Sequence, residues 1–168
     1  MHPTAIDNYE RFLEKKISDK SLSYTLVDIG SYDVNGTLKP SSIKFLPNIK
    51  YIGVDQELGA NVDIVADAHN LPFENDSVDI IISSSFFEHD EMFWQTFKEM
   101  SRICKSNGWI YICAPSTGGY HAYPSDCWRF YIDSWKALAK WCPQMELIES
   151  YLDRRLPWQD CVGIYRKK

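Results

Sequence analysis

Residues 77–83 read SVDIIIS, and this stretch decides the fold. Its apolar residues, Val78 and Ile80 to Ile82, are β-branched, and the run is too short for an independent helix, which is typical of a central strand in a parallel sheet. Apolar runs at 24–29, 51–54 and 62–65 end near Gly30, Asp55 and Asp67 and predict three further buried strands. Three more strands are expected at 109–114, 146–151 and 161–165.

Helical periodicity separates these runs at three places. The first helix begins at a Thr4 cap, the second runs from Asp90 to Gly108, and the third runs from Asp133 to Pro143. Strands alternating with helices predict an α/β fold with a mostly parallel twisted sheet of about seven strands and helices on both faces. Residues 56–61 are fewer than the roughly 10 to 12 that a helical crossover needs, so we expect abbreviated connections.

Composition limits the protein class. The chain has 168 residues, 45% of them hydrophobic, which predicts one soluble globular domain. A net charge of -5 argues against nucleic-acid binding. The five cysteines have no C-x-x-C spacing, which favours a reducing cytoplasmic setting, and no segment is expected to span a membrane. Within the domain we expect an N-terminal helix at 1–22, a ligand-binding core at 23–115, and an acceptor loop with C-terminal strands at 116–168.

Polar residues at the strand ends indicate the ligand. In open parallel sheets, ligands bind outside the carboxyl ends of the strands. Asp55, at the end of the second strand, can accept hydrogen bonds from both hydroxyls of a ribose. Asp67, followed by Ala68, suits the exocyclic amine of an adenine ring. These residues predict an adenosine-containing ligand, although the two aspartates also fit turn caps.

The chain resembles the class I S-adenosylmethionine-dependent methyltransferases at VDIGS (27–31), YIGVD (51–55), VADAHNLPF (65–73) and SVDIIIS, followed by Glu88-His89. The resemblance implies a Rossmann-like fold that binds S-adenosylmethionine, with Asp28 and Gly30 near the methionine part, Asp55 on the ribose, and Asp67 with Ala68 on the adenine. The expected cofactor-binding set is Asp28, Gly30, Ser31, Tyr32, Asp55, Gln56, Asp67, Ala68 and Ser84. The family usually has a Gly-x-Gly sequence where this chain has Gly30-Ser31-Tyr32, so the second glycine is missing. A dinucleotide oxidoreductase would need the full glycine pattern more strongly, because its backbone must approach a pyrophosphate, so its absence disfavours that class.

Two segments are candidates for the acceptor site. His89 follows the central strand, and residues 116–131 form a long segment without clear secondary structure after the next one. We expect His89, His121 and Asp126 to be catalytic, and an acceptor to contact Tyr120, Tyr123, Trp128 and Arg129. Alternatively, His89 caps the following helix, and Asp126 with Arg129 forms a salt bridge that orders the loop. No metal is expected, since no His and carboxylate cluster has clear ligand spacing.

The expected reaction is methyl transfer from S-adenosylmethionine to a sugar or glycan hydroxyl, because the chain resembles compact variants of the family that act on glycans or small molecules. Three alternatives stay open. These are N- or C-methylation of a small metabolite, a nicotinamide-dependent oxidoreductase, and a non-enzymatic nucleoside-binding module. The short chain leaves little room for an inserted cap, so a homodimer or a partner domain is a further expectation.

Overall fold

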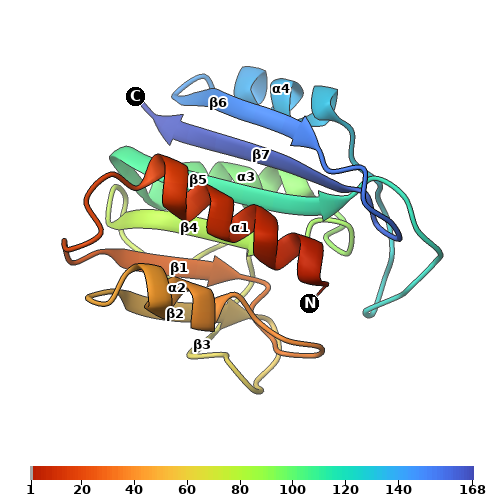
Figure 1. Cartoon of the computed structure of the whole chain (residues 1–168), viewed down its shortest axis with the longest axis horizontal. Coiled ribbons are helices and arrows are strands. Elements are labelled where there is room, and N and C mark those ends of the chain that lie inside the picture. Colours follow the sequence, from red (N-terminus) through yellow and green to blue (C-terminus); the bar gives the residue numbers. More distant parts are fainter. Residues whose placement is uncertain (1) are drawn as a thin grey trace.

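The computed structural model describes residues 2–168 and is built on a seven-stranded sheet with the order β3-β2-β1-β4-β5-β7-β6 (Figure 1). The strands are β1 (Thr25–Ile29), β2 (Lys50–Asp55), β3 (Ile64–Val65), β4 (Val78–Ser84), β5 (Cys104–Pro115), β6 (Met145–Leu152) and β7 (Asp160–Lys167). The helices are α1 (Pro3–Lys16), α2 (Lys39–Phe45), α3 (Phe93–Ile103) and α4 (Ile132–Trp141). The predicted α/β, mostly parallel, Rossmann-like architecture is confirmed.

The parallel strands end at a common edge. β1 pairs with β2 on one side and β4 on the other, so that Asp28 lies beside Gly53 and Ile82. β7 runs antiparallel to both of its neighbours in the sheet, β5 and β6. The carboxyl ends of β1, β2 and β4 therefore meet where the chain leaves the sheet, which is the edge at which open parallel sheets bind ligands.

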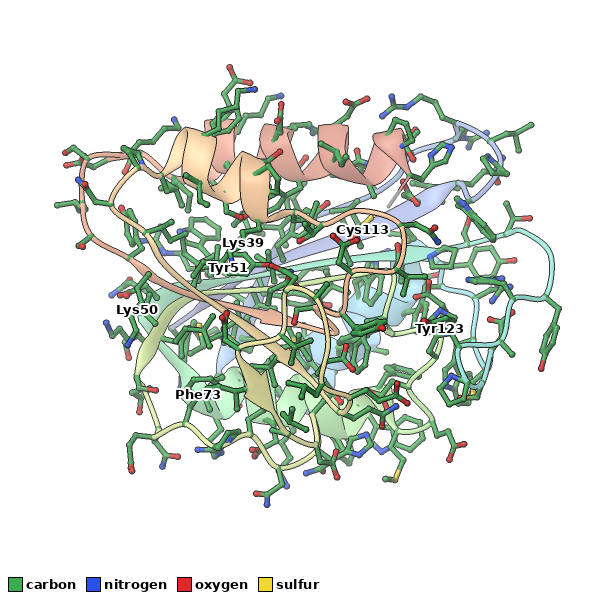
Figure 2. The ribbon with its side chains drawn as sticks, turned by 90° about the horizontal axis from the view of Figure 1, so that it is seen from below. Lys39, Lys50, Tyr51, Phe73, Cys113 and Tyr123 are labelled. Carbon is green, nitrogen blue, oxygen red and sulfur yellow. The ribbon has the colours of Figure 1, made fainter. Side chains whose placement is uncertain are left out.

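Helices cover both faces of the sheet (Figures 1 and 2). α1 and α2 lie on one face, where Tyr9 and Phe12 of α1 pack on Tyr111 of β5 with ring centroids 5.4 and 5.1 Å apart. α3 and α4 lie on the other face, where the ring centroids of Phe97 and Tyr165 are 4.8 Å apart. The inward residues of both faces are buried from solvent, and burial of such apolar side chains is the main force that holds the layers together.

Helix α3 ends earlier than the sequence predicts. It stops at Ile103, and β5 begins directly at Cys104, whereas the apolar repeat predicts helix as far as Gly108. The pairing of β4 with β5 shifts here, from Val78 opposite Cys104 to Ile80 opposite Trp109, so extra residues bulge out of β5. Gly108 therefore lies inside this irregular strand rather than at a helix end.

The helix starts also differ in detail. The ring of His2 accepts the backbone N–H of Thr4, so His2 rather than Thr4 caps α1. Asp90 lies three residues before Phe93, the first residue of α3, yet it accepts hydrogen bonds from Met92 N (2.9 Å) and Thr96 Oγ1 (2.5 Å) and so stabilises the first turn.

The connections around β2 and β3 are abbreviated, as predicted. α2 has seven residues, and residues 56–63 join β2 to the parallel β3 without a helix. In the described part of the chain, no helix combines the length and the apolar character that crossing a membrane requires.

Candidate active site

A cavity of about 1140 Å³ opens at the carboxyl ends of the parallel strands. Its walls come from the segments that follow β1, β2, β3 and β4 and from loop 116–131, whose Tyr123 is labelled in Figure 2. All nine residues of the expected cofactor set line it, and so do His89, His121 and Tyr123 of the expected acceptor set. The cavity is large enough for a cofactor and a second small molecule.

Gly30 starts the turn that forms one wall. Its φ is +77°, in the left-handed region that favours glycine, and a Cβ atom built on it would lie 2.5 Å from the side chain of Phe86. Its N–H and that of Ser31 both donate to the carbonyl of Val54, at 2.9 and 3.1 Å. These contacts tie the turn to β2. Ser31 Oγ donates a hydrogen bond to Asn61 O at 3.1 Å, so the hydroxyl hydrogen is already bonded within the protein.

Asp55 stands at the end of β2 and fixes the loops on either side. Its Oδ2 accepts from the backbone N–H of Tyr32 at 3.1 Å, and its Oδ1 accepts from that of Glu57 at 3.2 Å. The carboxylate is partly exposed and faces the cavity. Each carboxylate oxygen has more than one lone pair, so Asp55 keeps the capacity to accept further hydrogen bonds from a ligand.

Asp28 is a buried carboxylate one residue from the end of β1. Burial raises its pKa to about 7, although a hydrogen bond from the Tyr51 hydroxyl opposes this rise and the nearby charge of Asp55 adds to it. Tyr51 also accepts a hydrogen bond from Asn61 Nδ2 at 3.1 Å, and Lys39 lies 4.9 Å from its ring centroid (Figure 2). A cationic ligand group would favour the ionised form of Asp28.

Asp67 and Ala68 lie after β3 at the same cavity. Asp67 is exposed and accepts the backbone N–H of His69 at 2.8 Å. The His69 ring lies between two carboxylates, with Nδ1 3.0 Å from Asp67 and Nε2 2.8 Å from Asp90. These contacts hold the segment after β3 against the start of α3.

Glu88, His89 and His121 meet at another part of the cavity wall. Glu88 is 1% exposed, and its Oε1 lies 3.7 Å from His89 Nε2 and 3.9 Å from His121 Nε2. The interaction with this carboxylate is the largest cause that raises the pKa of His121 above its usual value. The structure thus brings together the histidines of two expected acceptor segments and adds a buried acid between them.

Loop 116–131 is held down beside this cluster. The backbone N–H groups of Cys127 and Trp128 donate to Glu88 O at 2.7 and 3.1 Å, and Ser125 Oγ donates to His89 O at 3.0 Å. The indole of Trp128 donates to Asp90 O at 2.9 Å. Although it lacks helix and strand, the loop is thus anchored on the segment that follows β4.

Four expected acceptor residues stand apart from the described cavity lining: Tyr120, Asp126, Trp128 and Arg129. Tyr120 is 81% exposed. Asp126 accepts hydrogen bonds from Arg129 at 2.6 and 2.9 Å and from the backbone N–H of His121 at 2.8 Å. Arg129 holds the pKa of Asp126 far below its usual range. This geometry matches the salt-bridge alternative, and the catalytic and substrate roles of the four residues stay predictions.

The sequence analysis assigns no role to three residues that shape the site, of which Glu88 lines the cavity. An acid directly before His89 is a usable sequence signal for Glu88. Tyr51 and Asn61 buttress Asp28 and the turn after β1, and Asn61 does so with a positive φ of 69°. No local sequence pattern distinguishes such residues from ordinary strand and turn positions.

Comparisons with known proteins agree with this geometry. A family model described as a methyltransferase domain matches residues 42–112. No curated protein matches the chain. The solved structures that it resembles include a SAM-dependent methyltransferase from Aquifex aeolicus (15% identity, TM-score 0.65, covering 99% of this chain and 98% of that one).

Two further structures have the same fold. A putative methyltransferase from Haloferax volcanii, in complex with the activator Trm112, has 16% identity and a TM-score of 0.70, covering 98% of this chain and 90% of that one. The 1,6-didemethyltoxoflavin-N1-methyltransferase from Burkholderia thailandensis, with bound S-adenosylhomocysteine, has 12% identity and a TM-score of 0.73, covering 98% and 78%. At these identities the similarity establishes the fold alone.

Residues 42–112 thus resemble a methyltransferase domain, and the chain has the fold of S-adenosylmethionine-dependent methyltransferases. The cavity fits this cofactor. It presents a buried carboxylate for a cationic group in Asp28, a hydrogen-bond acceptor at a strand end in Asp55, and small apolar side chains in Ala66 and Ala68.

Proposed function

We propose that the enzyme transfers a methyl group to an oxygen atom, namely a hydroxyl of a sugar or glycan. The observation that carries this proposal is the convergence of His89 Nε2 and His121 Nε2 beside the buried Glu88 carboxylate at the cavity wall. A hydroxyl is a poor nucleophile at neutral pH and gains from a positioned base, whereas a neutral amine needs none. A site with two imidazoles and an acid is therefore suited to an oxygen acceptor.

For the cofactor we propose three carboxylate contacts. Asp55 accepts hydrogen bonds from the ribose, Asp67 accepts one from the adenine amine, and Asp28 faces the positively charged methionine part. The presence of all three aspartates in one cavity supports this assignment. When bound, S-adenosylmethionine supplies an electrophilic methyl group on a sulfonium sulfur.

The protein contributes alignment and proton transfer. Loop 116–131 covers the acceptor and holds His121, while the segment after β4 holds Glu88 and His89. As the carbon–oxygen bond forms and the methyl–sulfur bond breaks, the hydroxyl proton passes to an imidazole Nε2, and Glu88 stabilises the resulting positive charge. We assign Asp126 and Arg129 to ordering the loop, because each is the other's ion-pair partner at 2.6 Å. We further propose that the whole chain works as one domain in the cytoplasm.

Methyl transfer to a panel of acceptors tests this function. The purified enzyme is incubated with cofactor labelled in its methyl group and with monosaccharides, oligosaccharides, their deoxy analogues and matched amines. We expect label on sugars, and loss of label when the reactive hydroxyl is replaced by hydrogen. Label on amines or carbon acids with none on hydroxyls would instead support N- or C-methylation of a small metabolite.

A further inference from the structure

Glu88, His89 and His121 have the arrangement of a metal site. One ligand atom from each residue can be chosen so that all three lie within 4.8 Å of one another. Glu88 Oε1 is 3.7 Å from one Nε2 and 3.9 Å from the other, and the imidazole rings are nearly perpendicular with centroids 5.0 Å apart. Ligands about 2.0–2.1 Å from a tetrahedral Zn²⁺ are roughly 3.3–3.5 Å apart, so small side-chain movements would close the site.

The hydrogen bonds of the two rings prepare Nε2 for coordination. His89 Nδ1 lies 2.6 Å from Ser125 O, and His121 Nδ1 lies 3.1 Å from Gly119 O. A carbonyl oxygen only accepts hydrogen bonds, so these two contacts favour a hydrogen on each Nδ1. In a neutral imidazole this leaves Nε2 unprotonated and able to bind a metal ion, and each Nε2 lies within 4 Å of Glu88 Oε1. Metal-bound histidines are oriented in this way by a carbonyl or carboxylate on the other ring nitrogen.

Glu88 supplies a second, independent observation. Its side chain is 1% exposed, and Oε2 has no hydrogen-bond partner among the residues that the structure describes. An ionised carboxylate without water or a full set of partners is costly to bury. A dication held between Glu88 and the two imidazoles would compensate the charge and give the unpartnered oxygen a ligand role.

We propose that Glu88, His89 and His121 bind one divalent transition-metal ion, with Zn²⁺ the best match to two imidazoles and one carboxylate. Three protein ligands leave at least one coordination position open, and all three residues line the cavity. The sequence led us to expect no metal, because spacing alone does not reveal that loop 116–131 brings His121 to the other two ligands.

This inference rests on the proposed function for its chemistry and refines it. An acceptor hydroxyl at the open position would lose its proton more readily, because a bound dication lowers the pKa of an oxygen ligand. The proton then passes to solvent instead of to an imidazole. The oxygen forms its bond to the methyl carbon as the methyl–sulfur bond breaks, and neutral S-adenosylhomocysteine is left.

Calorimetric titration of the chelator-treated full chain with Zn²⁺ tests the site. We expect saturable binding of one ion per chain, at least about 100-fold weaker in His89→Ala, His121→Ala and Glu88→Gln. The matched control is Cys127→Ser, since this exposed thiol is the nearby group that would bind Zn²⁺ adventitiously. Titration with Co²⁺ adds a spectroscopic readout, because visible bands of a four-coordinate ion should appear in the wild type and be absent from His121→Ala.

The outcomes separate this inference from the proposed function. No saturable Zn²⁺ binding by the wild type, unchanged binding in the two histidine variants, or loss of binding in Cys127→Ser would overturn the metal site. If that happens while label still reaches sugar hydroxyls, the proposed function stands without a metal. If one ion binds as expected but only amines are labelled, the metal site stands and the oxygen acceptor is wrong.

Discussion

The hydroxyl of Tyr51 on β2 donates a hydrogen bond to Oδ2 of Asp28 on the adjacent strand β1. The bond lowers the pKa of this carboxyl, but burial raises it by more, and the resulting pKa is about 7. Because Asp28 faces the cavity that we assign to a cationic cofactor, its protonation should be coupled to cofactor binding.

We therefore predict that affinity for S-adenosylmethionine rises with pH across neutrality. The ionised carboxylate binds the cation, so affinity is full above the pKa of Asp28 and falls as pH drops through it, approaching about tenfold per unit below the midpoint. Calorimetry between about pH 6 and about pH 8 measures this. Asp28→Asn should flatten the profile, and Tyr51→Phe should move its midpoint upward. A flat wild-type profile would rule out the coupling.

Gly30→Ala should destabilise the fold. The substitution places a side chain at φ +77° and 2.5 Å from Phe86, so backbone strain and overpacking add to a cost of roughly 2–5 kcal/mol in the free energy of unfolding. Urea denaturation measures it. Gly119→Ala is the matched control, because a Cβ atom there meets nothing within 4 Å. Equal stability of the two variants would mean that the turn after β1 is not constrained as described.

His121→Ala should lower turnover and leave cofactor affinity nearly unchanged. Its Nε2 lies 3.9 Å from Glu88 Oε1, in the part of the cavity that we assign to the acceptor. We therefore expect kcat to fall by about 100-fold or more, the range attributed to a positioned proton acceptor. Single-turnover kinetics and calorimetry with S-adenosylhomocysteine provide the two readouts. Comparable losses of turnover and of affinity for S-adenosylhomocysteine would show that His121 maintains the structure of the whole cavity.

The variant Asp126→Asn distinguishes two roles for Asp126, that of a proton acceptor and that of a residue that anchors the loop. Arg129 holds the pKa of Asp126 far below its usual range, so we expect the carboxylate to position His121 through its backbone N–H and to take no proton. The variant should lose roughly 10- to 100-fold in rate through misplacement, with the same pH midpoint as the wild type. Disappearance of the acidic limb of the pH–rate profile would restore Asp126 as the base.

Sequence patterns predicted most of this fold because each depends on neighbours along the chain. The run around Ile81 could only be a buried strand, and the aspartates at strand ends had to meet at one edge once the strands were parallel. Sequence patterns did not predict features of the structure that depend on contacts between residues far apart in the chain. The end of α3 at Ile103 follows from a bulge opposite β4, and the approach of His121 to Glu88 follows from the docking of a loop without periodicity.

We infer that the cavity at the carboxyl ends of β1, β2 and β4 binds an adenosine through separate carboxylates. This inference is tested by calorimetric titration of S-adenosylhomocysteine into the wild type, Asp55→Ala and the control Asp133→Ala, whose side chain is exposed. We predict one molecule bound per chain, affinity reduced by at least about tenfold in Asp55→Ala through lost charge-assisted hydrogen bonds, and no change in Asp133→Ala. No binding by the wild type, or equal affinity in Asp55→Ala, would show that the carboxylates of this cavity do not bind the nucleoside.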